Sequence, residues 1–407
     1  MTSNLRIILV SPGAHYPSHL WPNTVALLRE MRKKNYNASA IIFSSGTEAV
    51  PPDLRDVVEP VFARAPRFLE MAAAGKWQER RLMSRIMNAF ETWVCLRKAL
   101  AKTGDEPNAV LHFIGGFYWL VMLAALFSRR KFVHSLYGEF FSAGSRGWRA
   151  FTSPRLEKLI RRAVATGRLD FTCETELLRG QMAPLLGGHV HVVPYAIDDT
   201  IQLPSRAEAR ERLGLPAHEK IILFFGTHRR EKDYRTALKG CLSLPDPPLA
   251  LFVGKVISSN DPRQIVADCA YPKALVVDEF VADEKIKDYF AAADAAALPY
   301  EAEFSRGSGV LIECCRFLRP MIVSATPYFS PFLARYNCGV GYAPGDSASF
   351  AEAAARVLSN GEIFQPGLQQ ARREHSWNRV ADQYLGLYTG KGESSSSSSS
   401  SSPPHRR

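Results

Sequence analysis

The sequence ALPYEAEFSRGSGVLIE, residues 297–313, decides which fold this chain can adopt. Residues 291–298 are small and apolar except for Asp294, which is typical of a buried strand. Residues 310–312 are apolar and begin a helix, so the glycine turn of residues 307–309 lies at a helix N-terminus. Free backbone N–H groups and the positive end of the helix dipole favour an anion such as a phosphate at this position.

Glu313 lies one helical turn beyond this glycine turn. A carboxylate there does not suit a phosphate, but it can accept hydrogen bonds from a pair of sugar hydroxyls. An acid that only complements the helix dipole is the alternative interpretation. Because a carboxylate between Ile312 and the adjacent Cys314 and Cys315 is costly to bury without a partner, we favour a functional role. The turn and the acid together point to a sugar nucleotide.

Strand and helix patterns alternate along the rest of the chain, which indicates an α/β fold with parallel sheets. A strand pattern at residues 5–10, a helical pattern at 21–31 and a second strand pattern at 38–43 form a βαβ start. It has no G-x-G-x-x-G fingerprint, so a nicotinamide cofactor is not supported. Further strands are expected at residues 110–113, 131–134, 171–173, 190–193, 220–226, 249–254 and 274–277, and a long helical region at 69–102.

Several segments resemble the GT-B glycosyltransferases, specifically the retaining group called family 4. Glu313 matches the second acid of the family's motif, in which seven residues separate two Glu, and residues 317–324 match the helix end and strand that follow it. Residues 192–198 align with the family's strand that precedes the interdomain connection, and residues 375–388 match the family's last helix. The resemblance implies the GT-B fold: an α/β protein with two Rossmann-like domains whose parallel sheets face a central cleft.

The resemblance also implies a division of the chain. Residues 1–198 are expected to form an N-terminal Rossmann-like domain that binds the acceptor. Residues 205–375 are expected to form a C-terminal Rossmann-like domain that binds the nucleotide-sugar donor, and residues 376–389 a helix that crosses back to the first domain. Residues 390–407 contain nine consecutive serines and are expected to be a disordered tail.

The resemblance assigns roles to residues at strand ends. His134 ends a strand of the first domain, where the family histidine faces the donor sugar and the acceptor; a core or loop histidine is the alternative, and His112 is a weaker candidate. Ser305 stands where the family has its first acid, and Glu303, ranked above Glu301, competes for that role. The catalytic candidates are His134, Glu303 and Ser305, and the donor-binding candidates are Gly13, Arg229, Arg230, Lys232, Gly307, Ser308, Gly309, Val310 and Glu313.

Lys232 lies six residues after Gly226, where the family places its phosphate-binding lysine, and Arg229 or Arg230 is within reach of the same phosphate. A solvated charge run, His-Arg-Arg-Glu-Lys, is the alternative interpretation. Ligands bind at strand ends in open α/β sheets, which favours the functional interpretation for the lysine. No Asp-x-Asp triplet occurs, so a divalent metal as phosphate clamp lacks its usual ligands, and we expect neither a metal nor a cofactor.

Composition restricts the class of protein and its partners. The 407 residues are long enough for two domains, and contents of 46% hydrophobic and 22% charged residues are ordinary for a soluble globular protein. The net charge of +11 favours acidic partners such as nucleotide diphosphates, anionic membrane surfaces or nucleic acid. Nucleic acid is disfavoured because no binding motif is present. Basic and aromatic residues within 69–102 motivate the hypothesis of peripheral contact with anionic lipid.

The sequence favours a cytoplasmic protein, with peripheral contact at the inner face of the membrane as a hypothesis. The seven cysteines show neither paired nor metal-ligand spacing, which suggests a reducing compartment, and no signal peptide is visible. The apolar run at 109–127 contains Gly115 and Gly116, so we interpret it as a buried strand, a turn and a buried helix rather than a membrane span.

These patterns and the resemblance predict a glycosyltransferase that moves a sugar from a nucleoside-diphosphate sugar to a glycan, lipid or small-molecule acceptor. Retention at the anomeric carbon is implied by the resemblance alone. Two alternatives remain: a GT-B sugar-nucleotide epimerase, which would share the fold and the donor site, and a non-catalytic member that only binds a nucleotide sugar.

Overall fold

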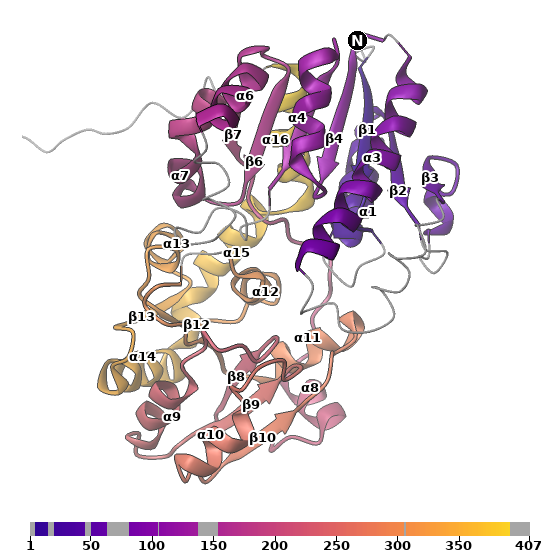
Figure 1. Cartoon of the computed structure of the whole chain (residues 1–407). Coiled ribbons are helices and arrows are strands. Elements are labelled where there is room, and N and C mark those ends of the chain that lie inside the picture. The colour runs from indigo at the N-terminus through magenta and orange to yellow at the C-terminus, as the bar shows by residue number, and fades with distance from the viewer. Residues whose placement is uncertain are drawn as a thin grey trace, which may run out of the picture.

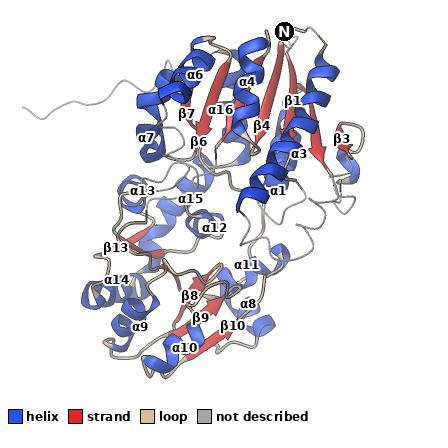
Figure 2. Ribbon diagram, in the orientation of Figure 1, coloured by secondary structure: helices blue, strands red, loops and turns tan. Residues whose placement is uncertain are grey.

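The computed structural model describes residues 5–14, 20–44, 50–62, 81–104, 106–136, 154–304 and 307–390. These residues form two separate parallel sheets, each covered by helices on both faces (Figure 1, Figure 2). Buried parallel strands read as continuous apolar runs, and the first strand of each sheet has such a run, IILV after Arg6 and IILF at the start of the other. The predicted α/β class is therefore confirmed.

The first sheet is built from residues before 193. Its elements are β1 (Arg6–Ser11), α1 (Leu20–Lys33), β2 (Asn37–Phe43), η1 (Pro52–Leu54), β3 (Val58–Val61), α3 (Arg81–Thr103), β4 (Ala109–Ile114), α4 (Tyr118–Phe127), β5 (Lys131–Ser135), α6 (Pro154–Ala165), β6 (Leu169–Cys173), α7 (Glu176–Leu186), η3 (Gly187–His189) and β7 (Val190–Val192). The strand order is β3-β2-β1-β4-β5-β6-β7, and all neighbouring strands are parallel.

The second sheet and its helices follow. The elements are α8 (Arg206–Leu213), β8 (Ile221–Phe225), α9 (Tyr234–Leu242), β9 (Leu249–Val253), α10 (Pro262–Asp268), β10 (Ala274–Val277), α11 (Asp283–Ala292), β11 (Ala295–Leu298), α12 (Gly309–Arg316), β12 (Met321–Ser324), α13 (Phe329–Tyr336), β13 (Gly339–Tyr342), α14 (Ser347–Ser359), η4 (Gly361–Phe364), α15 (Gln365–Glu374) and α16 (Trp377–Thr389). The order β10-β9-β8-β11-β12-β13 is again parallel throughout.

The apolar run at 109–127 forms β4, a turn and α4, as predicted. Gly115 and Gly116 make the turn with φ angles of 77° and 97°, in the left-handed region that glycine adopts without steric cost. Among the helices in the described ranges, none combines the length and the apolarity that crossing a bilayer requires. The long helical region was expected from residue 69, but the helix that the structure describes begins at Arg81, and residues 63–80 lie outside the described ranges.

β3 was not predicted from the sequence. Of its four residues, VEPV, only Val58 is buried, and Pro60 cannot donate a hydrogen bond to a sheet. The strand lies at the edge of the first sheet and pairs only with β2. The backbone groups on its other side therefore need no partner strand. A short, charged, proline-containing edge strand carries little of the apolar signal that identifies the central strands.

The strand order reverses beside the first strand of each sheet. β1 lies between β2 and β4, and β8 lies between β9 and β11. Chain connections leave on opposite sides at such a reversal, which opens a crevice at the carboxyl ends of the two central strands where ligands bind. In the second sheet this point lies between the residues that follow Phe225 and those that follow Leu298. These are the two segments that carry most of the predicted donor-binding residues.

α16 packs against the first sheet although it follows the second sheet in the sequence (Figure 1). His112 of β4 joins it to the strands: one ring nitrogen, Nδ1, lies 2.6 Å from the Tyr388 hydroxyl, and the other, Nε2, lies 2.8 Å from the Ser135 hydroxyl. Ser135 continues the network to Tyr384 of α16 at 3.2 Å and to Thr172 at 2.8 Å. Burial lowers the pKa of His112 to about 3, so the ring is neutral and both nitrogens are used within the core.

We expect Tyr388→Phe to loosen α16 from the first sheet. The substitution leaves His112 Nδ1 buried without a partner, which costs about 1–3 kcal/mol. The melting temperature should fall, and the amides of α16 should exchange faster with solvent.

Asp382→Asn on the same helix is the matched control for this change. Asp382 forms a surface ion pair with Lys34 at 2.7 Å, and such pairs contribute about 0–1 kcal/mol. Equal effects of the two substitutions would show that the buried network does not hold the helix.

Candidate functional site

Lys232 is the central residue of the site at the carboxyl edge of the second sheet. The loop after β8 turns back toward the strand. As a result, Lys232 Nζ donates a hydrogen bond of 2.8 Å to the carbonyl oxygen of Phe225, the last residue of β8. The same loop pairs with the segment after β11 through a bridge between Lys232 and Tyr300, whose ring centre lies 5.9 Å from Nζ. Lys232 is only 6% exposed. The surface charge run expected as the alternative therefore does not describe this residue.

The ammonium group of Lys232 has no carboxylate within ion-pairing distance in the described part of the chain. Burial, and next the charge of Arg229, lower the pKa of Lys232 to about 7, while Glu231 acts in the opposite direction. A buried cation is costly unless an anion compensates for its lost hydration. The environment of Lys232 therefore suits an anionic ligand.

The N-terminus of α12 lies beside this lysine. A Cβ atom built on Gly226 would lie 3.7 Å from Lys232 Nζ and 3.1 Å from the Cγ2 atom of Val310, in the first turn of the helix. Gly226 has a φ of 86° and meets Gly254, whose own added Cβ would lie 2.4 Å from the Gly226 carbonyl oxygen. Both positions require glycine, and they allow the lysine and the helix terminus to approach one another.

Gly307, Ser308, Gly309 and Val310 are the predicted residues at this terminus. The backbone N–H of Ser308 has a hydrogen-bond partner, whereas those of Gly309 and Val310 have none among the described residues. Ser308 is the N-cap: its hydroxyl accepts a hydrogen bond from Leu311 N at 3.4 Å, and its own N–H donates to the Tyr328 hydroxyl at 3.1 Å. The N–H groups of Gly309 and Val310, the first two helical residues, make no hydrogen bond to any described residue. These two N–H groups, rather than that of Ser308, are available to an anion.

Gly307 has a different function in the fold. A Cβ atom there would lie 2.7 Å from the ring of Tyr195, in the connection between the two sheets. Gly307 thus lets the start of α12 contact the segment that leaves the first sheet. α12 lies on the side of the second domain that faces the first domain (Figure 1).

Glu313 lies on the second turn of α12, and its side chain is 23% exposed. Arg316 Nη1 donates to its two carboxylate oxygens at 3.2 and 3.5 Å, and Arg316 Nη2 lies 4.0 Å from Asp198 in the interdomain connection. Burial raises the pKa of Glu313, and the charge of Arg316 opposes this shift. The sequence interpretation assumed a carboxylate without a partner; the structure supplies one, so burial alone no longer argues for function.

His134 lies at the end of β5 in the first sheet and is 1% exposed. Its Nε2–H donates to the carbonyl oxygen of Gly115 at 3.1 Å, while Nδ1 is buried without a partner in the described ranges. Burial lowers the pKa of His134 to about 4, so the ring is neutral at physiological pH. This neutral histidine lies on β5, one strand beyond the β1–β4 pair at the order reversal, whereas His112 belongs to the packing of α16.

The remaining candidates lie around these groups. Arg229 and Arg230 are exposed, and Arg229 Nε donates to the hydroxyl of Thr227 at 3.0 Å. Arg229 is close enough for its charge to act on Lys232. Glu301 and Glu303 are exposed in the loop after β11. Gly13 lies in the turn after β1, and Ser305 lies outside the described residues. In the described ranges, no group of three or more His, Cys, Asp or Glu is placed to hold a metal ion.

His228 is a residue of the site that the sequence interpretation missed. It is fully buried, its Nδ1 lies 2.7 Å from the Tyr234 hydroxyl, and its Nε2 has no partner in the described part of the chain. Burial, and next the charge of Lys232, lower its pKa to about 4. The sequence offered no signal for it, because it opens a run of charged residues that reads as a surface loop.

Comparison with known proteins shows that this chain is similar to glycosyltransferases. Residues 205–374 match the family model described as Glycosyl transferases group 1. TuaC of Bacillus subtilis, a glycosyltransferase named for teichuronic acid biosynthesis, is 28% identical over 40% of this chain and 39% of its own length. A D-inositol 3-phosphate glycosyltransferase of Nocardiopsis dassonvillei is 27% identical over 49% of this chain and 50% of its length. The chain therefore aligns with half or less of these relatives.

Solved structures match over nearly the whole chain. A sucrose-phosphate synthase from Thermosynechococcus elongatus has a TM-score of 0.70 at 15% identity and covers 95% of this chain and 99% of its own. HepE of Anabaena in complex with UDP has a TM-score of 0.66 at 13% identity and covers 95% of this chain and 100% of its own. The chain has the GT-B fold, as the sequence resemblance predicted, and residues 205–374 in its second domain match the glycosyl transferases group 1 family model.

The low pKa of Lys232 predicts a pH-dependent affinity for a diphosphate such as UDP. The free protein loses the positive charge as the pH rises through about 7, and an anion binds the charged form. Affinity for UDP should therefore fall above this pH, by up to about tenfold per unit, and binding should take up a proton.

Isothermal titration between about pH 7 and pH 9, in buffers of different ionisation enthalpy, measures both effects. Lys232→Arg remains charged over this range and should flatten the pH profile. A wild-type affinity that does not change with pH would remove Lys232 from the anion site.

Proposed function

We propose that this chain is a retaining, family 4-like glycosyltransferase that transfers a sugar, as a hexosyltransferase does, from a nucleoside-diphosphate sugar to a glycan, lipid or small-molecule acceptor. The observation that carries the proposal is the ammonium group of Lys232. It is buried without a carboxylate partner and lies beside the first turn of α12, where two backbone N–H groups are available. A cation beside a helix N-terminus suits a diphosphate.

The relatives and structural neighbours support this choice of ligand class. HepE of Anabaena has been solved with UDP and with UDP-glucose, and it shares the fold of this chain. TuaC and the D-inositol 3-phosphate glycosyltransferases are glycosyltransferases by name, and their similarity to this chain covers only part of each protein. Sugar transfer by the whole chain is therefore our inference from the site.

Sugar transfer breaks the bond between the anomeric carbon and the diphosphate, and negative charge develops on the departing diphosphate. Lys232 and the N–H groups of Gly309 and Val310 would stabilise that charge, because preorganised donors in a dry site act strongly on developing charge. Without an Asp-x-Asp triplet in the sequence, we assign this task to these groups rather than to a metal. Glu313 would accept hydrogen bonds from the ribose hydroxyls.

Residues beyond the diphosphate would contact the sugar. The neutral ring of His134 would face the donor sugar and acceptor from the first domain, with Glu303 or Ser305 supplying contact from the second. A sugar-nucleotide epimerase would use the same donor site, and a non-catalytic member would bind the donor without reaction. The three functions differ in their products.

A panel of UDP-, GDP- and ADP-sugars in a thermal-shift assay tests the donor class first. We expect at least one to raise the melting temperature of the wild type and not that of Lys232→Ala, because one charge-assisted contact contributes about 1.5–3 kcal/mol. The stabilising donor is then incubated with the protein and with acceptor mixtures. Transfer or slow hydrolysis of the donor supports the proposal, an isomerised nucleotide sugar indicates an epimerase, and an unchanged donor indicates a binding protein.

Two single substitutions, Glu313→Gln and Arg316→Gln, test the role of Glu313. If Glu313 holds the ribose, Glu313→Gln should weaken donor binding by about ten- to a hundredfold, and less for a 2′-deoxyribose donor that lacks one of the hydroxyls. Arg316→Gln removes the same ion pair and keeps the carboxylate, so it should bind the donor nearly as the wild type does. If both variants bind donor normally and only melt earlier, the glutamate serves the helix alone.

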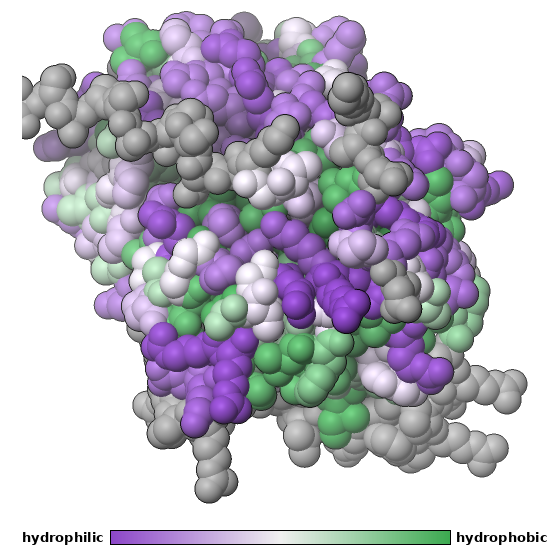
Figure 3. Space-filling model, turned by 90° about the horizontal axis from the view of Figure 1, so that it is seen from above, coloured by the Kyte–Doolittle hydropathy of each residue, from purple (hydrophilic) through white to green (hydrophobic). Residues whose placement is uncertain are grey.

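Peripheral contact with anionic lipid remains a proposal for the acceptor side. Phe62, Ile86 and Trp93 expose 66%, 40% and 43% of their surface, and the Arg97 guanidinium lies 5.0 Å from the Trp93 ring centre. Seen from above, the visible part of the molecule carries separate apolar patches among hydrophilic groups (Figure 3). Flotation with anionic liposomes at low and high salt tests this contact, which should weaken with salt; no recovery at low salt would exclude it.

A further inference from the structure

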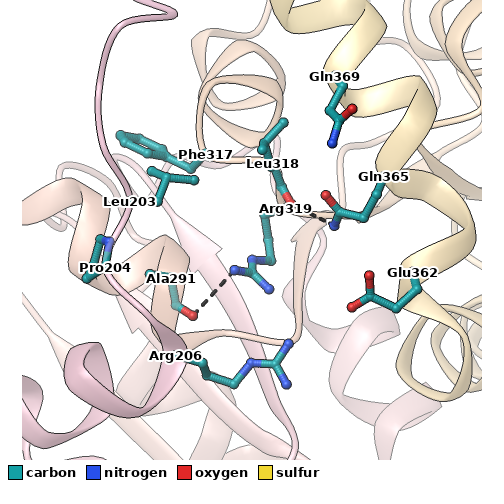
Figure 4. Close-up of a pocket in the computed structure, with 10 residues that line it drawn as sticks. All are labelled: Leu203, Pro204, Arg206, Ala291, Phe317, Leu318, Arg319, Glu362, Gln365 and Gln369. Atoms are coloured by element: carbon teal, nitrogen blue, oxygen red, sulfur yellow. Dashed lines mark hydrogen bonds between the residues drawn. The ribbon is translucent and has the colours of Figure 1, made fainter.

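A cavity of about 450 Å³ lies at the amino ends of the strands of the second sheet (Figure 4). Its walls come from the connection before α8, the end of α11, the loop between α12 and β12, and the segment from η4 into α15. The lining residues are Leu203, Pro204, Arg206, Ala291, Phe317, Leu318, Arg319, Glu362, Gln365 and Gln369. The volume is within the usual range for small-molecule sites.

This cavity is separate from the donor site. Arg319 precedes β12 and Ala291 precedes β11, so the cavity lies at the amino ends of the strands, whereas Lys232 lies at their carboxyl ends. α12 spans the distance between the two edges, with its N-terminus at Lys232 and its C-terminus at the cavity. Nothing in the proposed sugar transfer uses the residues of this cavity.

Arg319 has an incomplete set of partners. Its Nη2 donates to the carbonyl oxygen of Ala291 at 3.3 Å, and its Nε is buried without a hydrogen bond in the described part of the chain. No carboxylate of a described residue lies within ion-pairing distance of it. Burial, and next the charge of Arg206, lower the pKa of Arg319 to about 10. A guanidinium group in this state can accept an additional anionic partner.

Arg206 supplies a second cation to the same space. Its side chain is 47% exposed and ends in the cavity near Arg319, as Figure 4 shows. Its Nη1 pairs with Asp294 at 3.1 Å, but that carboxylate is also held by Arg210 at 2.9 Å and by the Ile221 N–H at 2.8 Å. Asp294 therefore keeps its other partners if Arg206 turns toward a ligand. An anion between the two guanidinium groups would also relieve their mutual repulsion.

The other walls indicate what the anion carries. Gln365 and Gln369 of α15 and Glu362 of η4 provide amide and carboxylate groups across the cavity from Arg206 (Figure 4). Gln365 Nε2 is engaged with the Leu318 carbonyl oxygen at 3.1 Å, which leaves its side-chain oxygen as an acceptor. Acceptors facing a pair of cations suit a ligand that has an anionic end and a hydroxyl-bearing end.

We propose that this cavity binds a small phosphate monoester, with its phosphate between Arg206 and Arg319 and its hydroxyl groups against Gln365, Gln369 and Glu362. Arg is suited to this task because its planar fork matches two phosphate oxygens. Free phosphate shares the anionic end of the ligand and lacks the hydroxyl-bearing end. The site is independent of the donor site, and its ligand is neither the donor nor the acceptor of the proposed reaction.

Titration of the full chain with glycerol 3-phosphate and with inorganic phosphate tests the proposal. The measurements are made in the Lys232→Ala background, so that the cation of the donor site does not contribute. We expect saturable binding, tighter for glycerol 3-phosphate, that weakens with salt. Arg206→Gln should weaken both ligands by about tenfold or more, as the loss of one charge-assisted contact does.

Arg212→Gln is the matched control on the same helix. Its side chain is 52% exposed and pairs with Asp288 at 2.9 Å, outside the cavity. Gln369→Ala should weaken glycerol 3-phosphate and leave inorganic phosphate unchanged. Arg319→Lys keeps the charge but loses the fork, and it should weaken both ligands in a protein whose circular dichroism matches that of the wild type.

Three results would overturn the inference. The first is the absence of saturable binding of either ligand to the Lys232→Ala protein. The second is equal weakening by Arg206→Gln and Arg212→Gln, which would indicate only a general effect of surface charge. The third is equal affinity for both ligands, unaffected by Gln369→Ala, which would replace the monoester site with a site for free phosphate.

Discussion

A buried ammonium group without a carboxylate partner is the constraint around which the carboxyl edge of the second sheet is arranged. Lys232 has given up its hydration for one carbonyl hydrogen bond, and its pKa of about 7 reflects the cost. The loops on either side hold the group in place, since the bridge to Tyr300 joins the turn after β8 to the segment after β11. An arrangement that is unfavourable in the free protein and favourable with an anion present belongs to binding rather than to stability.

The connections between the two sheets fix the position of the first domain relative to the second. The chain leaves the first sheet through residues 193–205 and returns through α15 and α16, and the two crossings pair with each other. Ile197 N donates to the His375 carbonyl oxygen at 2.7 Å, and Trp377 N donates to the Ile197 carbonyl oxygen at 3.1 Å. Paired backbone at this position restricts how the domains can move, while the buried network of His112 fixes the returning helix to the first sheet.

Much of the fold could be predicted because central parallel strands are continuous apolar runs. The same logic fails for β3, whose edge position removes the need for such a run. Lys232 and the glycine turn follow β8 and β11 in the structure, as the strand patterns indicated, and their role in a site stays a prediction. The burial of Lys232, the hydrogen bond between Ser308 N and Tyr328, and the ion pair of Glu313 depend on side chains that meet only after folding. His228 and the cavity around Arg319 are built from segments distant in sequence, so no local pattern could reveal them.

The end of α12 illustrates how the two edges of the sheet are linked. The helix ends at Arg316, and two residues later Leu318 has a φ of 52°, a left-handed conformation that costs a residue other than glycine about 1 kcal/mol. Two hydrogen bonds maintain it: Arg319 N donates to the Cys314 carbonyl oxygen at 2.8 Å, and Gln365 donates to the Leu318 carbonyl oxygen. The resulting turn directs Arg319 into the cavity, and the leucine side chain forms part of its wall. Glycine would end the helix without strain but would remove that part of the wall, so the Leu318 side chain links the end of α12 to the shape of the cavity.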